Sequence, residues 1–211
     1  MNVQREEIYS QRKQVLDGMD LSSVISNYID WVARATVETY HESDEKGKLT
    51  LNIEALSNEI VSTFGINMLD ELKDKSGDVE AIISSLQEKA HEKYAEKEKE
   101  IEAEQLREIE RIVMLKVVDQ KWMAHIDNMD HLKQGMGLRA FKQQDPVQAY
   151  QMEGSAMFEE MIEGIKVDTV KYMFHVHFHT LAYILLVLSV PSQSISICKD
   201  VCILRCLHFF L

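Results

Sequence analysis

The 211-residue sequence is poor in the residues that interrupt helices. It has only two prolines and eight glycines, and no glycine follows Gly164. Because proline and glycine mark turns and helix ends, their scarcity leaves long uninterrupted segments and disfavours a fold of many short strands. With 45% hydrophobic residues, the chain can still bury a core. We therefore predict an all-α fold.

Cysteine and positive charge are also scarce. No cysteine precedes Cys198, which fits a reducing compartment. The formal net charge is −12, whereas non-specific binding of nucleic acid depends on clustered Lys and Arg. We expect no nucleic-acid partner. Residues 1–14 show no cationic leader followed by an apolar stretch, so we expect no secretory signal and favour a cytoplasmic location.

A phosphate-binding loop is missing. The only Gly-Lys pair is Gly47-Lys48, and a loop that ends there needs glycine at position 42 and Ser or Thr at position 49. The chain has Glu42 and Leu49 instead. We therefore expect no nucleotide site and predict no catalytic residue in this chain.

Histidines and cysteines do not form a convincing metal-binding pattern. His125 and His131 lie on one predicted helix, but six residues turn by about 600°, which separates the two rings around the axis. We expect both, with Asp127 and Asp130, on the solvent-facing side of that helix. Near the C-terminus, alternating histidines would share a strand face and the cysteines a helix face, but the Cys-x2-Cys zinc spacing is absent. We predict no metal site.

Two long segments between residues 112 and 174 show the periodicity of amphipathic helices. Apolar residues recur at steps of three and four, which places them on one face of each helix. On the first segment they are Ile112, Leu115, Val118, Trp122, Ile126, Met129, Leu132 and Met136, and on the second Phe158, Ile162, Ile165, Thr169 and Met173. These faces predict an antiparallel helical hairpin. The packing residues that we predict are Trp122, Ile126, Met129, Phe158, Ile162 and Ile165.

The turn between these helices, residues 137–144, has an unusual composition. Asp145-Pro146 favours the start of the second helix, because the carboxylate accepts from free amides and the proline ring is preset near the helical φ. A purely structural turn favours small polar residues, yet this one contains Phe141, Arg139 and Lys142. We interpret the tip as a contact surface.

The residues before 104 predict smaller helical elements. Helical patterns cover residues 2–16, 21–40 and 53–64, and another begins at residue 79. Interruptions are expected at Gly18, at Gly65 and at the turn 76–78. The polar segment 41–48 is expected to be a loop.

Glutamate recurs at every fourth position from Glu88 to Glu108. Four residues turn by about 400°, so this stripe drifts around the helix axis and cannot form one buried face. Opposite charges three residues apart, such as Glu104 and Arg107, offset the repulsion by about a few tenths of a kcal/mol. We expect a solvated acidic face rather than an acidic docking surface.

The character of the chain changes at about His175. Residues 175–211 contain all three cysteines but only three charged residues among Asp, Glu, Lys and Arg. The apolar run 181–190 is shorter than the roughly 20 residues that a spanning helix needs, and Pro191 ends it. Two interpretations remain open: a segment that associates with a membrane surface, or foreign sequence such as the product of a shifted reading frame.

Several ordered motifs between residues 1 and 174 resemble the later, helical part of SecA, the motor ATPase of bacterial preprotein export. They are the runs 1–9 (MNVQREEIY), 113–122 (VMLKVVDQKW), 125–130 (HIDNMD) and 132–135 (LKQG), followed by Leu138-Arg139, Asp145-Pro146 and the stretch to Phe158. The order and spacing of these motifs make the resemblance specific.

The resemblance implies a division into regions. Residues 1–40 would form the first part of the helical scaffold, residues 41–103 the helical wing and residues 104–174 the two-helix finger of the scaffold. Residues 175–211 would replace the usual C-terminal continuation with an atypical apolar tail.

In that family the finger enters the cytoplasmic mouth of the SecY channel, and a bulky residue at its tip contacts the translocating polypeptide. By position, the implied contact residues are Leu138, Arg139, Phe141 and Lys142. The implied partners are the SecY channel complex, unfolded preproteins and the nucleotide-binding domains of the motor, and an anionic membrane surface is a further expected partner. The implied location is cytoplasmic, at the inner face of the plasma membrane.

The family couples ATP hydrolysis, with Mg, to preprotein movement. The nucleotide-binding domains have no counterpart in these residues, so the resemblance implies a C-terminal fragment that is non-catalytic by itself and holds no cofactor. The alternative is a stand-alone helical interaction module with a membrane-associating tail, which binds a partner helix in a groove.

Overall fold

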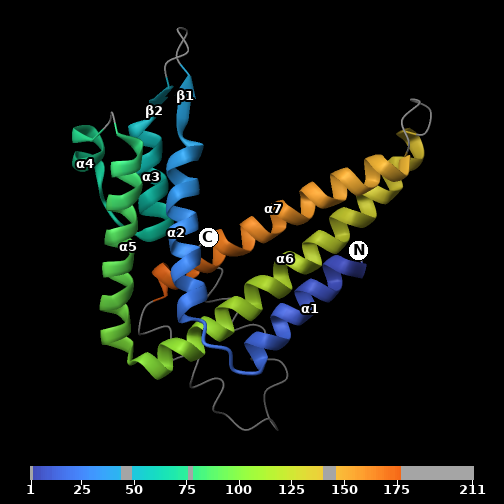
Figure 1. Ribbon diagram of the computed structural model, residues 1–211, viewed down its shortest axis with the longest axis horizontal. Helices are drawn as coiled ribbons and strands as arrows, with labels where there is room; N and C mark the ends of the chain where they lie inside the picture. Colours follow the sequence, from blue (N-terminus) through green and yellow to red (C-terminus); the bar gives the residue numbers. More distant parts are fainter. Residues whose placement is uncertain (1, 44–48, 76–77, 140–145, 177–211) are drawn as a thin grey trace, which may run out of the picture. The chain divides into compact units, whose positions relative to one another are not determined.

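The computed structural model describes residues 2–43, 49–75, 78–139 and 146–176 (Figure 1). Helices account for nearly all of these residues, which confirms the predicted all-α class. The elements are α1 (Asn2–Leu16), α2 (Ser22–Thr39), β1 (His41–Ser43), β2 (Leu49–Leu51), α3 (Ile53–Phe64), α4 (Leu69–Asp74), α5 (Val79–Ile101), α6 (Ala103–Arg139) and α7 (Pro146–His175).

Contacts within the chain divide it into two compact units, Met1–Phe174 and His175–Leu211. All but two residues of the second unit lie outside the described residues.

The interruptions predicted at Gly18 and Gly65 are confirmed, and α5 begins at Val79, directly after the predicted turn 76–78. α1 ends two residues before Gly18, whose φ is 89°. α3 ends at Gly65, which has a left-handed φ of 62° and donates its N–H to the Val61 carbonyl at 2.9 Å. At the start of α5, the Asp78 carboxylate accepts from the Ala81 N–H at 3.1 Å. These bonds satisfy main-chain groups that a helix leaves free at its ends.

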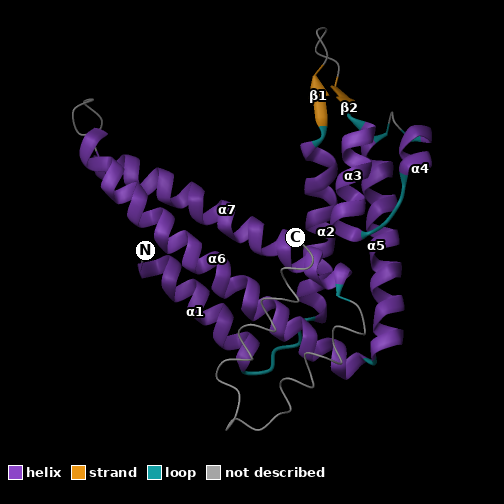
Figure 2. Ribbon diagram, turned by 180° about the vertical axis from the view of Figure 1, so that it is seen from behind, coloured by secondary structure: helices purple, strands orange, loops and turns teal. Residues whose placement is uncertain are grey.

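The prediction of a loop over residues 41–48 is wrong at residues 41–43. β1 pairs antiparallel with β2 (Figure 2). In this pairing Glu42 lies opposite Thr50. The ladder is made by main-chain N–H and C=O groups, which every residue carries. The polar composition of β1, poor in residues that favour strands, gave no sign of it.

The charged stretch around residues 88–111 contains a break that the sequence did not predict. α5 ends at Ile101, and Glu102 adopts φ 65° and ψ 135° before α6 begins at Ala103. A positive φ is uncommon outside glycine, and no glycine or proline marks the position. The six glutamates of the stripe, from Glu88 to Glu108, are all exposed, so the predicted solvated face is confirmed.

The apolar faces of α2, α3 and α5 form a shared core. Nine of its buried side chains are Ile25, Ile29, Val32, Leu56, Ile60, Phe64, Ile82, Ile83 and Leu86. Each such side chain contributes roughly 1.5 to 3 kcal/mol when it leaves water. Arg34 of α2 adds a bidentate pair to Glu80 of α5, at 3.0 and 3.1 Å.

Candidate functional site

α6 and α7, called here the α6–α7 hairpin, run side by side in opposite directions (Figures 1 and 2). An ion pair joins them near the middle, with Lys121 Nζ 2.6 Å from Asp168 Oδ2. Farther toward the tip, Met129 packs so closely on α7 that a Cβ added at Gly154 would lie 2.8 Å from the Met129 methyl. Glycine at this position allows the two helices to approach.

The structure buries only some of the predicted packing residues. Trp122, Met129 and Ile165 are buried, whereas Ile126, Phe158 and Ile162 are half-buried. Several neighbours that the sequence analysis did not select are buried too. They include Met114, Val117, Met161 and Val170.

His125 does not lie on the solvent-facing side of its helix, contrary to the prediction. It is only 3% exposed, and its ring lies 5.6 Å from that of Trp122 and 5.7 Å from that of Phe158 on α7. Burial lowers its pKa below the usual 6.5, because the charged imidazolium loses its hydration. Asp127, Asp130 and His131, which were also predicted to face solvent, are exposed as expected.

Gln4 of α1 connects both arms of the hairpin. Its Nε2 donates to the Gly154 carbonyl of α7 at 3.2 Å, and its Oε1 lies 3.4 Å from His125 Nε2 on α6. An amide oxygen only accepts, so the contact requires the proton of neutral His125 to sit on Nε2. One side chain therefore links three helices around a buried imidazole.

The tip residues lie at or beyond the limit of the structural description. Leu138 and Arg139 belong to the last turn of α6, and their side chains are outside the described residues. Phe141 and Lys142 are also outside them. The contact role of all four residues stays a prediction.

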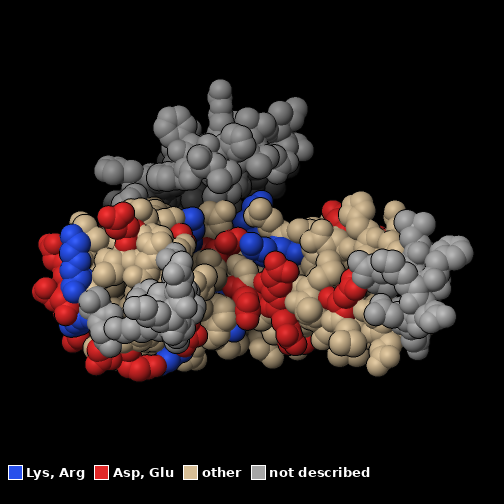
Figure 3. All heavy atoms as spheres, turned by 90° about the horizontal axis from the view of Figure 1, so that it is seen from above, with Lys and Arg blue, Asp and Glu red and all other residues tan. Residues whose placement is uncertain are grey.

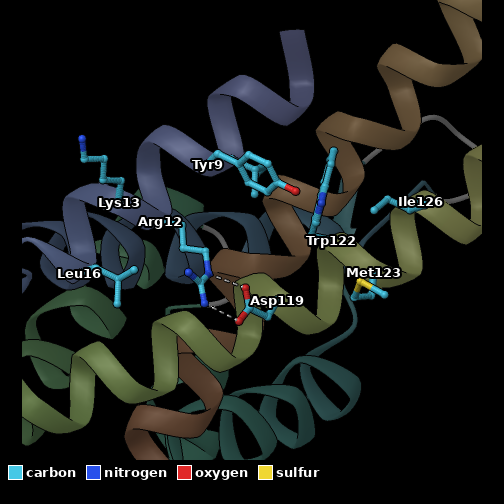
Figure 4. Close-up of a pocket in the computed structure, with 9 residues that line it drawn as sticks. Tyr9, Arg12, Lys13, Leu16, Asp119, Trp122, Met123 and Ile126 are labelled. Carbon is cyan, nitrogen blue, oxygen red and sulfur yellow. Dashed lines mark hydrogen bonds and ion pairs between the residues drawn. The ribbon is translucent and has the colours of Figure 1, made fainter. Parts of the chain in front are cut away.

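A groove of about 690 Å³ lies between α1 and α6 (Figure 4). From α1 it is lined by Tyr9 and Leu16, and from α6 by Trp122, Met123 and Ile126, among others. Tyr9, Leu16 and Met123 are more than half exposed, so the groove presents apolar side chains to solvent.

An ion pair closes one side of this groove. Arg12 of α1 meets Asp119 of α6, with Nε to Oδ1 at 2.9 Å and Nη2 to Oδ2 at 3.3 Å. The carboxylate raises the already high pKa of the guanidinium. Figure 4 shows both side chains pointing toward each other, while Lys13 points away.

Charged side chains hold the turn from α5 to α6, and of these Glu110 is buried while Arg107 and Glu98 are half-buried. Glu110 is fully buried and accepts from the Tyr94 hydroxyl and, at 2.6 Å, from Arg107. Arg107 also binds Glu98 on the other side of the break. Burial raises the pKa of Glu110, because its charged form is poorly solvated there. Among the described residues its second oxygen has no hydrogen-bond partner.

Two absences apply to the described part of the chain. Its acidic, histidine and cysteine side chains form no group of three or more that could hold a metal ion. None of its helices combines the length and the hydropathy needed to cross a bilayer.

On the face shown in Figure 3, basic and acidic side chains lie interspersed among uncharged ones.

Comparison with known proteins identifies the family. The family model described as the SecA wing and scaffold domain matches residues 1–177. Similar relatives, each named protein translocase subunit SecA, come from Clostridium novyi (strain NT), with 51% identity over 185 residues, and from Clostridium perfringens (strain ATCC 13124), with 52% over 180 residues. A third, from Clostridium acetobutylicum, is 51% identical over 179 residues.

In each case the alignment covers 83% of this chain and 21% of the relative's own length. The chain therefore spans about a fifth of the curated relatives it matches. The match runs through α1, the small helical elements and the α6–α7 hairpin. The chain belongs to the SecA family and carries its wing and scaffold domain.

Proposed function

We propose that this chain serves as the scaffold and wing of a protein-export motor and that its α6–α7 hairpin is the two-helix finger that acts on preproteins at the SecY channel. The observation that carries the proposal is the antiparallel hairpin itself, which lies within residues 1–177, the range matched by the SecA wing and scaffold model. Residues 138–142 at its tip supply the ring and the cations for contact.

The contacts along the hairpin suit a stiff lever. The Lys121–Asp168 pair and the close approach of Met129 to Gly154 join the arms at two heights. Gln4 braces both arms from α1. A hairpin fixed along its length moves as a unit, so a displacement at its base reaches the tip.

We expect ATP and Mg to bind outside this chain, because its sequence lacks a glycine-rich phosphate loop. In the proposed setting, nucleotide hydrolysis belongs to other domains of the motor, and these helices receive the motion. The setting that we propose is the cytoplasmic face of the membrane, beside the channel.

A chimera tests this function. Residues 1–174 replace the corresponding segment of the Clostridium novyi SecA, and preprotein uptake into vesicles that contain the SecY channel is measured. We expect the chimera to retain transport, because the exchanged segments are about half identical. An inactive chimera whose ATP hydrolysis and folding are intact would contradict the proposal.

The α1–α6 groove favours a second candidate, a stand-alone module that binds a partner helix. Its exposed apolar side chains, among them Tyr9 and Met123, are typical of a groove for an amphipathic helix. The chimera separates the two candidates, since a module unrelated to export does not sustain transport. Flotation of residues 175–211 with anionic liposomes tests the membrane-associating tail that this candidate includes.

A further inference from the structure

One face of α5 holds the C-terminal ends of two other helices. Lys93 Nζ donates to the carbonyls of Phe64 and Gly65 at the end of α3, at 2.8 and 2.7 Å. One turn later, Lys97 Nζ donates to the carbonyls of Met173 and Phe174 at the end of α7, at 2.6 and 2.7 Å. Residues four apart on a helix share a face, so the two caps are neighbours.

Both lysines occupy the place where a helix attracts a cation. The last four carbonyls of a helix have no partner within it, and they carry the negative end of the helix dipole. Each ammonium group here satisfies two of these carbonyls at once. Charge-assisted bonds of this kind are stronger than bonds between neutral groups.

The two capped ends also touch each other. The Phe64 and Phe174 rings pack edge to face, with centroids 5.3 Å apart and planes at 82°, and the Tyr94 ring lies 6.1 Å from Phe174. Phe64 and Phe174 are almost completely buried. An aromatic pair in this geometry adds attraction beyond simple burial. The end of α7 is thus seated against α3 as well as on α5.

Lys97 keeps this position although its surroundings disfavour its charge. The side chain is buried, and its pKa is lowered to about 8, chiefly by loss of hydration and then by the nearby charge of Lys93. An apolar residue would avoid that penalty but could not cap α7. The lysine is therefore explained by its bonds rather than by packing.

We propose that Lys93, Lys97, Phe64 and Phe174 form a clasp, a joint that couples the end of α3 to the base of α7. The two ammonium groups hold the two helix ends on α5, and the ring contact makes each end depend on the other. Release of α7 at Lys97 also loosens α3 at Lys93, and the converse holds. The clasp fixes the base of the α6–α7 hairpin independently of what the tip contacts.

Hydrogen exchange measured by mass spectrometry on the full 211-residue chain tests the clasp. In Lys97→Met we expect exchange at residues 170–174 to accelerate about tenfold or more, since a lost charged hydrogen bond corresponds to that factor or more. We also expect a smaller acceleration, about two- to fivefold, at residues 60–65 of α3. Lys93→Met should show the same two effects with their sizes reversed.

Two further variants isolate the ring contact and control for the loss of a lysine from α5. Phe174→Leu retains both caps but removes the ring contact, so it should uncouple the two helix ends. In this background, replacement of Lys97 should still raise exchange at residues 170–174 but should leave exchange at residues 60–65 unchanged. Lys99→Met, an exposed lysine on the same helix, should change neither peptide. Lysine variants that each affect only their own helix end would overturn the coupling, and no effect at 170–174 in Lys97→Met would overturn the cap.

Discussion

Lys121 and Asp168 form an ion pair of 2.6 Å between the two arms of the hairpin. They are separated by most of two long helices, so the pair fixes the register of one arm against the other. Both side chains are about one-third exposed, 32% and 35%, and pairs of this kind contribute roughly 0.2 to 1 kcal/mol because water screens them. The energy of the hairpin therefore comes mainly from the buried residues around this pair.

Replacement of Trp122 tests how much these buried residues contribute to stability. Replacement by alanine should lower the free energy of unfolding by about 3 to 5 kcal/mol, because a large buried side chain is lost and a cavity remains. The measurement is chemical denaturation followed by circular dichroism. Met123→Ala is the matched control, since this neighbour is 61% exposed and should change stability by less than about 0.5 kcal/mol. Equal losses of unfolding free energy in the two variants would mean that Trp122 is not part of the buried core of the hairpin.

His125 predicts a pH dependence. Its folded pKa is below 6.5 because the ring is buried, so between that folded pKa and 6.5 the unfolded chain binds more protons than the folded one. Stability should therefore fall as the pH drops below 6.5, and the loss should level off beneath the folded pKa. Denaturation curves of the wild type and of His125→Gln between pH 5 and 8 measure the difference. A His125→Gln variant with an unchanged pH slope would argue against a buried neutral imidazole.

Gln4→Ala should weaken the contact of α1 with the hairpin. It removes the bond to the Gly154 carbonyl and the acceptor for His125, at a loss of about 0.5 to 1.5 kcal/mol for a hydrogen bond of ordinary strength. Stability is again read from denaturation. If Gln4 acts through His125, the effects of Gln4→Ala and His125→Gln will not add. Additive effects would mean that the two side chains act separately.

Gly65→Ala and Gly135→Ala should change the stability of the fold in opposite directions. At Gly65 the φ is 62° and an added Cβ would lie 2.8 Å from Lys93 Nζ, so alanine should destabilise by about 1 to 2 kcal/mol through backbone strain. At Gly135, within α6, nothing lies within 4 Å of an added Cβ, so alanine should stabilise by up to about 1 kcal/mol through helix propensity. Thermal melting compares the two. If Gly135→Ala lowers the melting temperature, helix propensity does not decide the effect at this position and the prediction is wrong.

Sequence patterns predicted the helices and helix ends that depend on residues close together in the sequence. The long hairpin helices follow from the spacing of their apolar residues, and the end of α3 follows from Gly65, which supplies a left-handed φ. The division into scaffold, wing and finger regions, drawn from family resemblance, stays a prediction.

Features that depend on distant residues were missed. His125 is polar and was placed in solvent, but it is buried, and its ring lies 5.7 Å from that of Phe158 on α7. The turn at Glu102 has no glycine or proline to mark it. The role of Lys97 depends on the end of α7, 76 and 77 positions later, which no local pattern in α5 reveals. These three positions show where tertiary contacts decide the structure.

Preprotein transport by tip variants of the Clostridium novyi chimera tests the proposed role of the finger most directly. Phe141→Gly should leave folding and ATP hydrolysis intact and reduce preprotein uptake into SecY vesicles severely, while Gln143→Gly in the same turn should transport normally. Transport by Phe141→Gly at the level of the unmodified chimera would contradict the role that we propose for the finger.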